Sequence, residues 1–221
     1  MEETQTKTSV NPVSTIKSDN TNLVSVRNVP SFTGIEASTG VSVDFTQSNN
    51  QSVTVNVDPD KQQYVITEVE NGILKIFIRN KGVKNLNINN LKVAVSGPKL
   101  SRLTTKSGAS FKAVTPINES SFAASCNSGS LVSGTFKIAT NTALEIESGS
   151  SVKMNLDTKS LALDASSGSS LKLSGTANTS VISASSGSSV SAGDFVTKST
   201  VVDASSGSSV KINTTESITA S

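Results

Sequence analysis

Side chains that commonly carry catalysis are scarce in this chain of 221 residues. It holds one cysteine, Cys126, and no histidine. Sites built on a serine or cysteine activated by histidine are therefore excluded, and so are metal sites with histidine ligands. Neither a Gly-x-Ser-x-Gly nucleophile elbow nor a Gly-x4-Gly-Lys phosphate loop occurs. We therefore predict no catalytic residue, no metal-ligating residue and no cofactor.

Charged side chains nevertheless recur at fixed distances from a set of evenly spaced glycines. A polysaccharide-cleaving enzyme would need clustered carboxylates for a cation, or a basic residue as proton acceptor. Among the acidic positions, Ser183 stands between Asp164 and Asp203. These two carboxylates are therefore two repeats apart and would stand roughly 9–10 Å from each other, too far to share one ion. Solvated surface charge is the simpler interpretation. The rows are Glu145, Asp164 and Asp203 four residues before the glycine, and Lys112, Lys153, Lys172 and Lys211 four residues after it.

The two charged rows are correlated from repeat to repeat. A repeat with an acid in the first row carries lysine in the second, whereas repeats with Ser125 or Ser183 carry Ser133 or Ser191. The first repeat departs from the rule, because Thr104 accompanies its lysine. A corner between the rows would hold them apart, so no salt bridge is predicted within a repeat. Aromatic residues make up only 4% of the chain, so nucleic acid is not an expected partner.

The glycines themselves set the organisation of the C-terminal part. Their successive spacings are 21, 20, 19, 19 and 20 residues, and a fixed period near 20 predicts a solenoid. The clearest copies are Ala165–Leu171, Ala184–Val190 and Ala204–Val210, each Ala-Ser-Ser-Gly-Ser-Ser followed by an aliphatic residue. The glycines are Gly108, Gly129, Gly149, Gly168, Gly187 and Gly207.

Mostly aliphatic residues stand five and three positions before each glycine and three and five positions after it. In one repeat these are Leu163, Ala165, Leu171 and Leu173, with polar residues between them. Alternation with period two on both sides of a glycine predicts a strand, a corner with positive φ, and a second strand. With about 20 residues per coil, the pattern indicates an all-β fold, a right-handed parallel β-helix.

Two further expectations concern the interior of the solenoid. Cys126 occupies an inward column, so we interpret it as a small buried hydrophobe rather than a reactive thiol. The third side of each coil is weakly patterned, and only Leu156 and Phe195 are proposed as inward residues there.

We divide the chain into three parts. Residues 1–22 read as a disordered linker, and residues 23–99 as an N-terminal β region with a first coil and capping hairpins. Residues 100–221 are β-helix repeats, and Ile218 and Ala220 read as the first two inward positions of a coil that the chain does not finish. The first coil spans Phe32–Phe45, with Ile35, Ala37, Gly40, Val43 and Phe45 at the offsets of the later copies.

The insertion that follows the first coil reads as a small capping sheet. Val53, Val55 and Val57 alternate as a strand that stops at Asp58-Pro59-Asp60. Tyr64–Val69 and Ile73–Ile78 flank Asn71-Gly72, a strong hairpin signal. We expect this block to pack over the N-terminal end of the solenoid, because an open end exposes unpaired edges.

Several of these segments together resemble a known family. They are Phe32–Ser38, the hairpin at Asn71-Gly72, the segment Val93–Leu103 with its Gly-Pro, and the repeated Ser-Gly-Ser-Ser. From about residue 30 to 221 the chain resembles the putative auto-transporter adhesin head (GIN) domain family of envelope proteins in Bacteroides-like bacteria. The resemblance implies a β-helix exported to the periplasm, outer membrane or cell surface, often as a lipoprotein, and a role in adhesion.

We therefore expect a non-enzymatic, adhesin-like module of the cell envelope. A polysaccharide-active β-helix enzyme and a self-assembling scaffold, whose coils stack end to end, remain as alternatives. The expected partner is a surface glycan or a protein, with homo-oligomers forming through the solenoid ends. Contact with a membrane would come only through a lipid anchor outside this chain.

Overall fold

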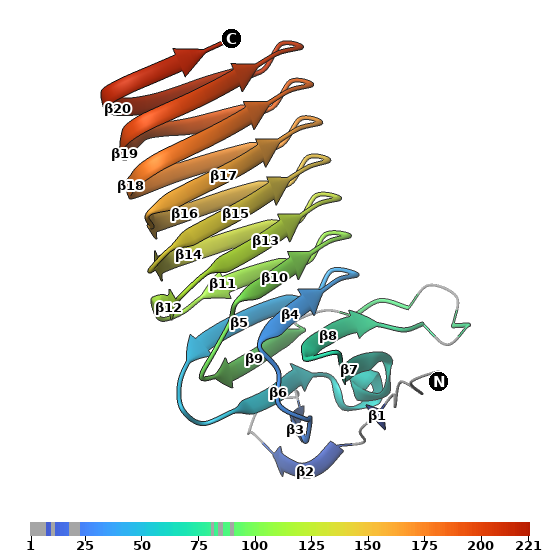
Figure 1. Ribbon diagram of the computed structural model, residues 1–221. Coiled ribbons are helices and arrows are strands. Elements are labelled where there is room, and N and C mark those ends of the chain that lie inside the picture. The colour runs from blue at the N-terminus through green and yellow to red at the C-terminus, as the bar shows by residue number, and fades with distance from the viewer. Residues whose placement is uncertain (1–7, 10–11, 18–22, 81, 84–85, 89–90) are drawn as a thin grey trace, which may run out of the picture.

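The computed structural model describes residues 8–9, 12–17, 23–80, 82–83, 86–88 and 91–221. These residues form a tall parallel β-helix that stands on a smaller antiparallel region at its N-terminal end (Figure 1). Within the described residues no helix has the length and apolarity needed to span a lipid bilayer.

Each coil of the β-helix carries a strand before the Ser-Gly corner and a strand after it, and the chain then turns through a third side. Strands of successive coils pair in parallel, with residues at equal offsets from the glycine opposite each other, such as Leu144 and Leu163. The strands before the corner are β4 (Gly34–Ala37), β10 (Arg102–Thr105), β13 (Phe122–Cys126), β15 (Asn141–Ile146) and β17 (Ser160–Ala165). The strands after the corner or on the third side are β5 (Ser42–Gln47), β11 (Ser110–Ala113), β12 (Ile117–Glu119), β14 (Leu131–Ile138) and β16 (Ser151–Asp157). Three longer strands begin after one corner and continue through the third side into the position before the next corner; they are β18 (Ser170–Ala184), β19 (Ser189–Ala204) and β20 (Ser209–Ala220).

The Ser-Gly corner is a tight turn with two successive left-handed residues. In one copy Ser167 has φ 54° and Gly168 has φ 71°, and the Ser169 N–H donates to the Ser166 carbonyl at 3.1 Å. This is the pattern of a type I′ turn, in which a serine takes the strained first position. The Gly168 N–H also donates to the Ser186 carbonyl of the next coil at 3.0 Å. The stacked corners therefore continue the hydrogen-bond ladder between coils.

The four predicted inward columns are confirmed. Leu163, Ala165, Leu171 and Leu173 are all buried, and the same offsets are buried in most other coils. Ala204 is an exception in the last coil, where it is exposed. On the third side, the two residues expected to point inward are also confirmed, because both side chains are fully buried. They are Leu156 and Phe195.

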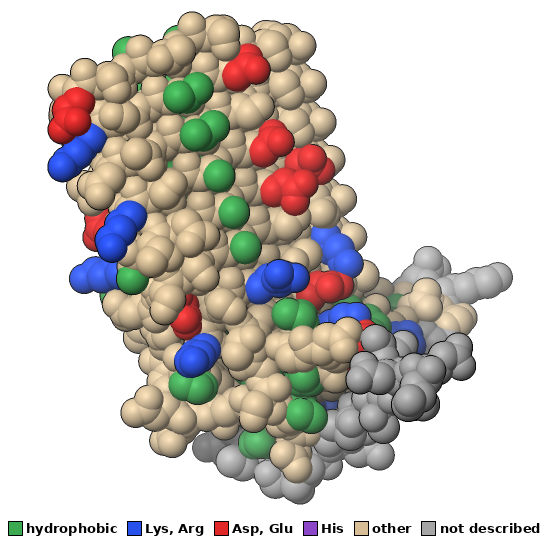
Figure 2. Space-filling model, viewed as in Figure 1, with side chains coloured by type: hydrophobic (Ala, Val, Ile, Leu, Met, Phe, Trp, Pro, Cys, Tyr) green, Lys and Arg blue, Asp and Glu red, His purple; other side chains and the backbone are tan. Residues whose placement is uncertain are grey.

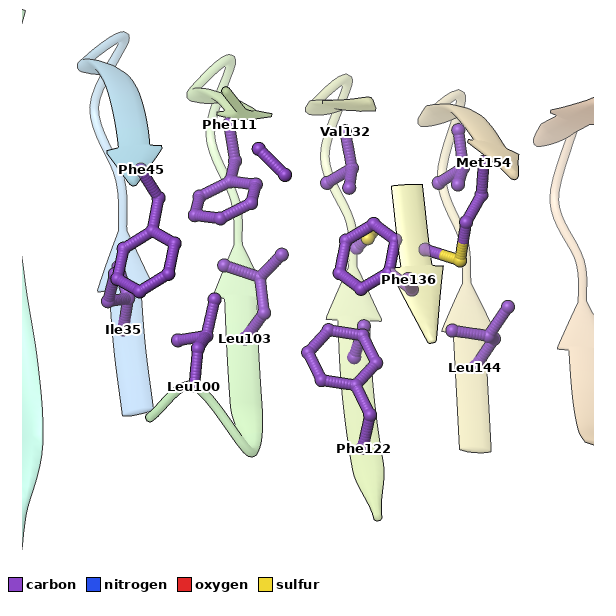
Figure 3. Packing of buried hydrophobic residues seen from close by; sticks show 14 of the residues in the cluster. Ile35, Phe45, Leu100, Leu103, Phe111, Phe122, Val132, Phe136, Leu144 and Met154 are labelled. Carbon is purple, nitrogen blue, oxygen red and sulfur yellow. The ribbon is translucent and has the colours of Figure 1, made fainter. Parts of the chain in front are cut away.

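Aromatic side chains fill the interior of the lower coils. Figure 3 shows Phe45 beside Phe111, and Phe122 beside Phe136, with smaller residues around them. The ring centroids are 6.1 Å apart in the first pair and 4.8 Å apart in the second. Gly134 makes room nearby, since a Cβ at that position would come within 2.4 Å of the Ala113 side chain. Large and small residues therefore alternate to fill a coil of nearly constant width.

The first coil and the hairpin are found where the sequence predicts them. Ile35 lies opposite Leu103 and Val43 opposite Phe111, so β4 and β5 form a true coil below β10 and β11. Strands β7 (Val65–Glu70) and β8 (Ile73–Ile78) pair antiparallel across Asn71-Gly72. Both turn residues have positive φ, as a two-residue hairpin requires.

The insertion covers the lower end of the solenoid and also continues its hydrogen-bond ladders, because strands of the insertion pair with the strands of the first coil. Strand β8 pairs in parallel with β4, and β9 (Lys92–Gly97) pairs in parallel with β5. Two further strands, β6 (Ser52–Val57) and β3 (Leu23–Arg27), continue the second ladder antiparallel. The predicted turn after β6 is a 3-10 helix, η1 (Pro59–Tyr64). The lower edges of β4 and β5 are therefore fully paired, which prevents them from pairing with other chains.

Two segments near the chain ends differ from the sequence-based interpretation. Within the predicted linker 1–22, the structure places β1 (Thr8–Ser9) and β2 (Pro12–Lys17), and β2 pairs antiparallel with β3. Residues 1–7, 10–11 and 18–22 lie outside the described residues. At the other end, Ile218 lies opposite Thr200, two positions earlier in the coil than predicted. The offset between paired residues falls from 20 at Ser189 and Ser209 to 18 at Thr200 and Ile218, whereas the predicted position, opposite Val202, required an offset of 16.

Candidate functional site

The face formed by the strands before the corner carries an apolar row and an acidic row. We call it the acidic face. Figure 2 shows a line of hydrophobic side chains running up this face, with acidic side chains to its right. The exposed fraction of Val181 is 56% and that of Val201 is 49%, so the row is open to solvent. The apolar row is Ala123, Ala143, Ala162, Val181 and Val201, and the acidic row contains Glu145, Asp164 and Asp203.

A shallow groove of about 480 Å³ follows this apolar row across several coils. Its floor includes Ala143 and Ala162, and Glu145 and Asp164 stand along one edge. Small side chains make the groove, because the neighbouring outward columns carry longer ones. Arg102 lies at the lower end of the groove, in the position where the apolar row would otherwise continue. The groove therefore offers an apolar floor with negative charge along one edge and the positive charge of Arg102 at its lower end.

The acidic row is an open array without the features of a catalytic pair. Glu145 lies directly opposite Asp164 in the ladder, while Ser183 stands between Asp164 and Asp203. Adjacent carboxylates on one sheet face point in the same direction, so they cannot flank a glycosidic bond from two sides. At the foot of the face Glu36 forms an ion pair with Lys106 at 2.7 Å.

The strands after the corner form a second outward face, which we call the lysine face. Its lysines alternate along the coils with serines, and a hollow of about 370 Å³ runs between its lower coils. Lys112, Lys153 and Leu131 line this hollow, and the exposed fraction of Leu131 is 54%. No residue lines both this hollow and the groove of the acidic face, which places the two charged rows on different faces. The lysine row is Lys112, Lys153, Lys172 and Lys211.

Several serines that directly follow the corner glycine are structural, whereas the buried hydroxyl of Ser169 in the same column has no hydrogen-bond partner among the described residues. Ser188 and Ser130 are buried, and their hydroxyls donate to carbonyls of the preceding coil, Ala165 at 2.9 Å and Thr105 at 3.0 Å. A hydroxyl held in this way satisfies a buried carbonyl and is not available as a nucleophile. The sequence pattern alone does not show that this position points inward.

Cys126 lies in the wall of the interior, as predicted. Its exposed fraction is 1%, and burial raises the pKa of its thiol to about 11. A hydrogen bond with Thr105 acts in the opposite direction and lowers that pKa. Reactive cysteines are accessible and have lowered pKa values, so this thiol has the character of a core residue.

A third concavity lies beside the turn between the third side and the acidic face. It has a volume of about 790 Å³ and is lined by polar residues such as Lys99, Asn118, Asp157 and Thr176. Within it the Thr176 hydroxyl donates to Asp157 at 3.1 Å. Among the residues that the structure describes, no three acidic, cysteine or histidine side chains gather in a metal-binding arrangement.

A family model matches this chain from residue 31 to residue 221, and it describes the "Putative auto-transporter adhesin, head GIN domain". The chain belongs to this family. The match covers the first coil, the insertion and all the repeats, which agrees with the segments that carry the sequence resemblance. No curated protein matches the chain in sequence.

Several solved structures share this fold. A putative adhesin from Parabacteroides distasonis ATCC 8503 superposes with a TM-score of 0.75 at 16% identity, covering 92% of this chain and 98% of its own. A putative lipid binding protein from the same strain gives 0.72 at 17% identity, covering 93% and 96%. A putative adhesin from Parabacteroides merdae ATCC 43184 gives 0.71 at 14% identity, covering 92% and 98%. At these identities the likeness establishes the fold alone.

Proposed function

We propose that this protein is a non-enzymatic, adhesin-like binding module of the cell envelope. The observation that carries the proposal is the distribution of its functional groups. Charged and apolar side chains recur once per coil along rigid outward faces, whereas catalytic sites bring different groups together in one enclosed place. The description of the family as adhesins, and of two similar structures as adhesins, supports the same assignment.

A β-helix suits this function because its backbone is fixed by ladders on every side of the coil. Outward side chains are therefore held at a repeat of about 4.8 Å along the axis. A partner with its own repeated charges can then contact many coils at once, so that weak single contacts add up along the face. This is how a surface without a deep pocket gains affinity and specificity.

The proposal is tested by measuring binding and turnover on the same preparation. Beads coated with the protein should attach to an array of immobilised glycans, matrix proteins or whole cells of the source bacterium. The same protein should release neither reducing ends nor unsaturated sugars from a panel of polysaccharides. Product release without any attachment would instead support the polysaccharide-active alternative. The proposed envelope location is tested by cell fractionation, and recovery in the cytoplasm would contradict it.

A further inference from the structure

The acidic row and the lysine row follow the same pattern from coil to coil, although they lie on different faces. In the five coils from Gly129 to Gly207, those that carry an acid also carry a lysine, as in Asp164 with Lys172, and those with serine in one row have serine in the other. The two lowest coils depart from this pattern, with Glu36 and Asp44 in one and Thr104 and Lys112 in the other. The pairs are Glu145 with Lys153, Asp164 with Lys172 and Asp203 with Lys211, and the serine pairs are Ser125 with Ser133 and Ser183 with Ser191. A matched pattern of this kind needs a physical reason.

Contacts within one molecule do not supply that reason. The ion pairs between described residues join other partners, Lys61 with Asp60, Lys75 with Glu70 and Lys106 with Glu36. The corner directs the two rows onto different faces, each lining its own hollow. The charges of one row are thus directed away from those of the other row in the same chain.

We propose that the partner of these faces is a second copy of this chain, whose lysine face packs against the acidic face of the first. The solenoid axes point in the same direction and the coils stand level. In the five coils from Gly129 to Gly207, each acid then meets the lysine of the partner's coil at the same height, and serine meets serine in the coils that lack charge. In the lowest coil Glu36 already has a partner, because it is paired with Lys106 of its own chain. Charge complementarity over several coils, in one register, explains the correlation between the rows.

The shape of the acidic face fits a lysine-bearing partner. A lysine side chain has an apolar stem and a charged end, so it packs well over small apolar residues with its ammonium group beside a carboxylate. The groove offers this surface, with Ala143 and Ala162 in its floor and Glu145 and Asp164 on its edge. Larger residues in place of Ala143 and Ala162 in the apolar row would hold the lysines of one copy away from the acids of the other.

The contact joins two different faces, so each copy keeps one face of each kind free. Association of this type is heterologous and continues sideways into rows of parallel solenoids. Exposed ion pairs are individually weak and are screened within about 10 Å at 0.1 M salt. The association should therefore be weak for a single pair of copies in solution and sensitive to salt.

Two charge-reversed variants test the proposal by complementation. One carries Glu145→Lys, Asp164→Lys and Asp203→Lys, and the other carries Lys153→Glu, Lys172→Glu and Lys211→Glu. Each alone presents two faces of the same sign, and sedimentation at low salt should show self-association at least about tenfold weaker than in the parent. An equal mixture of the two should recover it. Lys137→Glu, Lys159→Glu and Lys198→Glu, on the third side and its corner, form the matched control and should associate like the parent.

Single-cysteine variants test the direction of the axes. Asp203→Cys, mixed with Lys211→Cys and oxidised, should cross-link in good yield, while Asp203→Cys mixed with Lys112→Cys should not. The two lysines are five coils apart, about 24 Å along the axis. Preferred cross-linking to position 112 would overturn the parallel arrangement.

This inference rests on the proposed function, because it names the partner of a binding module, yet the two can fail separately. A parent protein that stays monomeric at high concentration and low salt, or a mixture of variants that does not recover association, overturns the inference alone. Attachment of the same protein to foreign surfaces would then leave the proposed function standing.

Discussion

The lower and upper coils of one solenoid fill their interiors with different side chains. From β4 to β14 the core contains paired phenylalanine rings, as in Phe122 and Phe136 (Figure 3). From β15 to β20 it contains mostly small and branched aliphatic residues, together with a buried group of hydroxyls at Ser180, Thr197 and Thr200. The coil nevertheless keeps almost the same length, since glycine spacings vary only between 19 and 21 residues.

This difference shows what defines a coil. The corner turn and the alternation around it set the path of the backbone, while the inward residues only have to fill the available volume. In the lower coils aromatic rings require small neighbours such as Gly134, so the repeat is harder to recognise there. In the upper coils aliphatic residues fill most levels around the corner, with Phe195 as an aromatic exception on the third side, so the repeat around the corner is almost exact in sequence.

A charge placed in the upper core should have the largest effect. Leu171 is buried and Ser170 is exposed, although they are neighbours in β18. Leu171→Asp would bury an unpaired charge and should lower the free energy of unfolding by about 3–5 kcal/mol. Ser170→Asp should change it far less. Urea unfolding of both variants measures the difference, and equal losses would show that the alternation at this corner is misassigned.

Removing a ring from the lower core should have the next largest effect. Phe136 is fully buried and packs against Phe122. Phe136→Ala would leave a cavity and should lower the free energy of unfolding by about 3–4 kcal/mol. In the upper coils Val190→Ala removes fewer atoms and should cost less. Thermal unfolding of the two variants compares the regions, and a smaller loss for Phe136→Ala would contradict the aromatic packing.

The ionisation of the Cys126 thiol makes the free energy of unfolding depend on pH. Its thiol pKa is raised from 9.0 to about 11 in the folded protein, so the folded state binds this proton more tightly than the unfolded state. The stabilisation that comes from this pKa shift is therefore fully present below pH 9. It is lost as the pH rises from 9 to 11, which lowers the free energy of unfolding by about 2–3 kcal/mol. Cys126→Ser should remove this pH dependence, as judged by unfolding at several pH values. Rapid labelling of the native thiol at pH 8 would contradict its burial.

Much of the fold follows from the sequence because it is encoded in local periodicity. The columns around each glycine, the first coil at Ile35 and Val43, and the hairpin at Asn71-Gly72 all depend on residues close together in the chain. The pairing of β8 and β9 with the first coil is different. It joins segments 39 to 50 residues apart, and no local pattern specifies such contacts.

The candidate site was accessible from the sequence only in part. The charged rows and their correlation can be read directly from the repeat. The groove cannot, because it depends on Ala143 and Ala162 standing beside longer side chains on the same face. The left-handed conformation of Ser167 was also missed, since serine rarely adopts it and only the following glycine signals the turn. The predicted register at Ile218 was wrong because it made the last coil two residues shorter than it is, and no glycine follows Ile218 to fix the offset.

The central claim is that the inward columns hold the fold, while the outward rows are free to bind a second copy. The most direct test is one variant with all six charges of the matched pairs removed, in which Glu145, Asp164, Asp203, Lys153, Lys172 and Lys211 are changed to serine. These residues are exposed, so unfolding should remain cooperative and its free energy should stay within about 1 kcal/mol of the parent. Sedimentation at low salt should show that self-association is lost. A variant that unfolds, or one that still associates like the parent, would contradict the account.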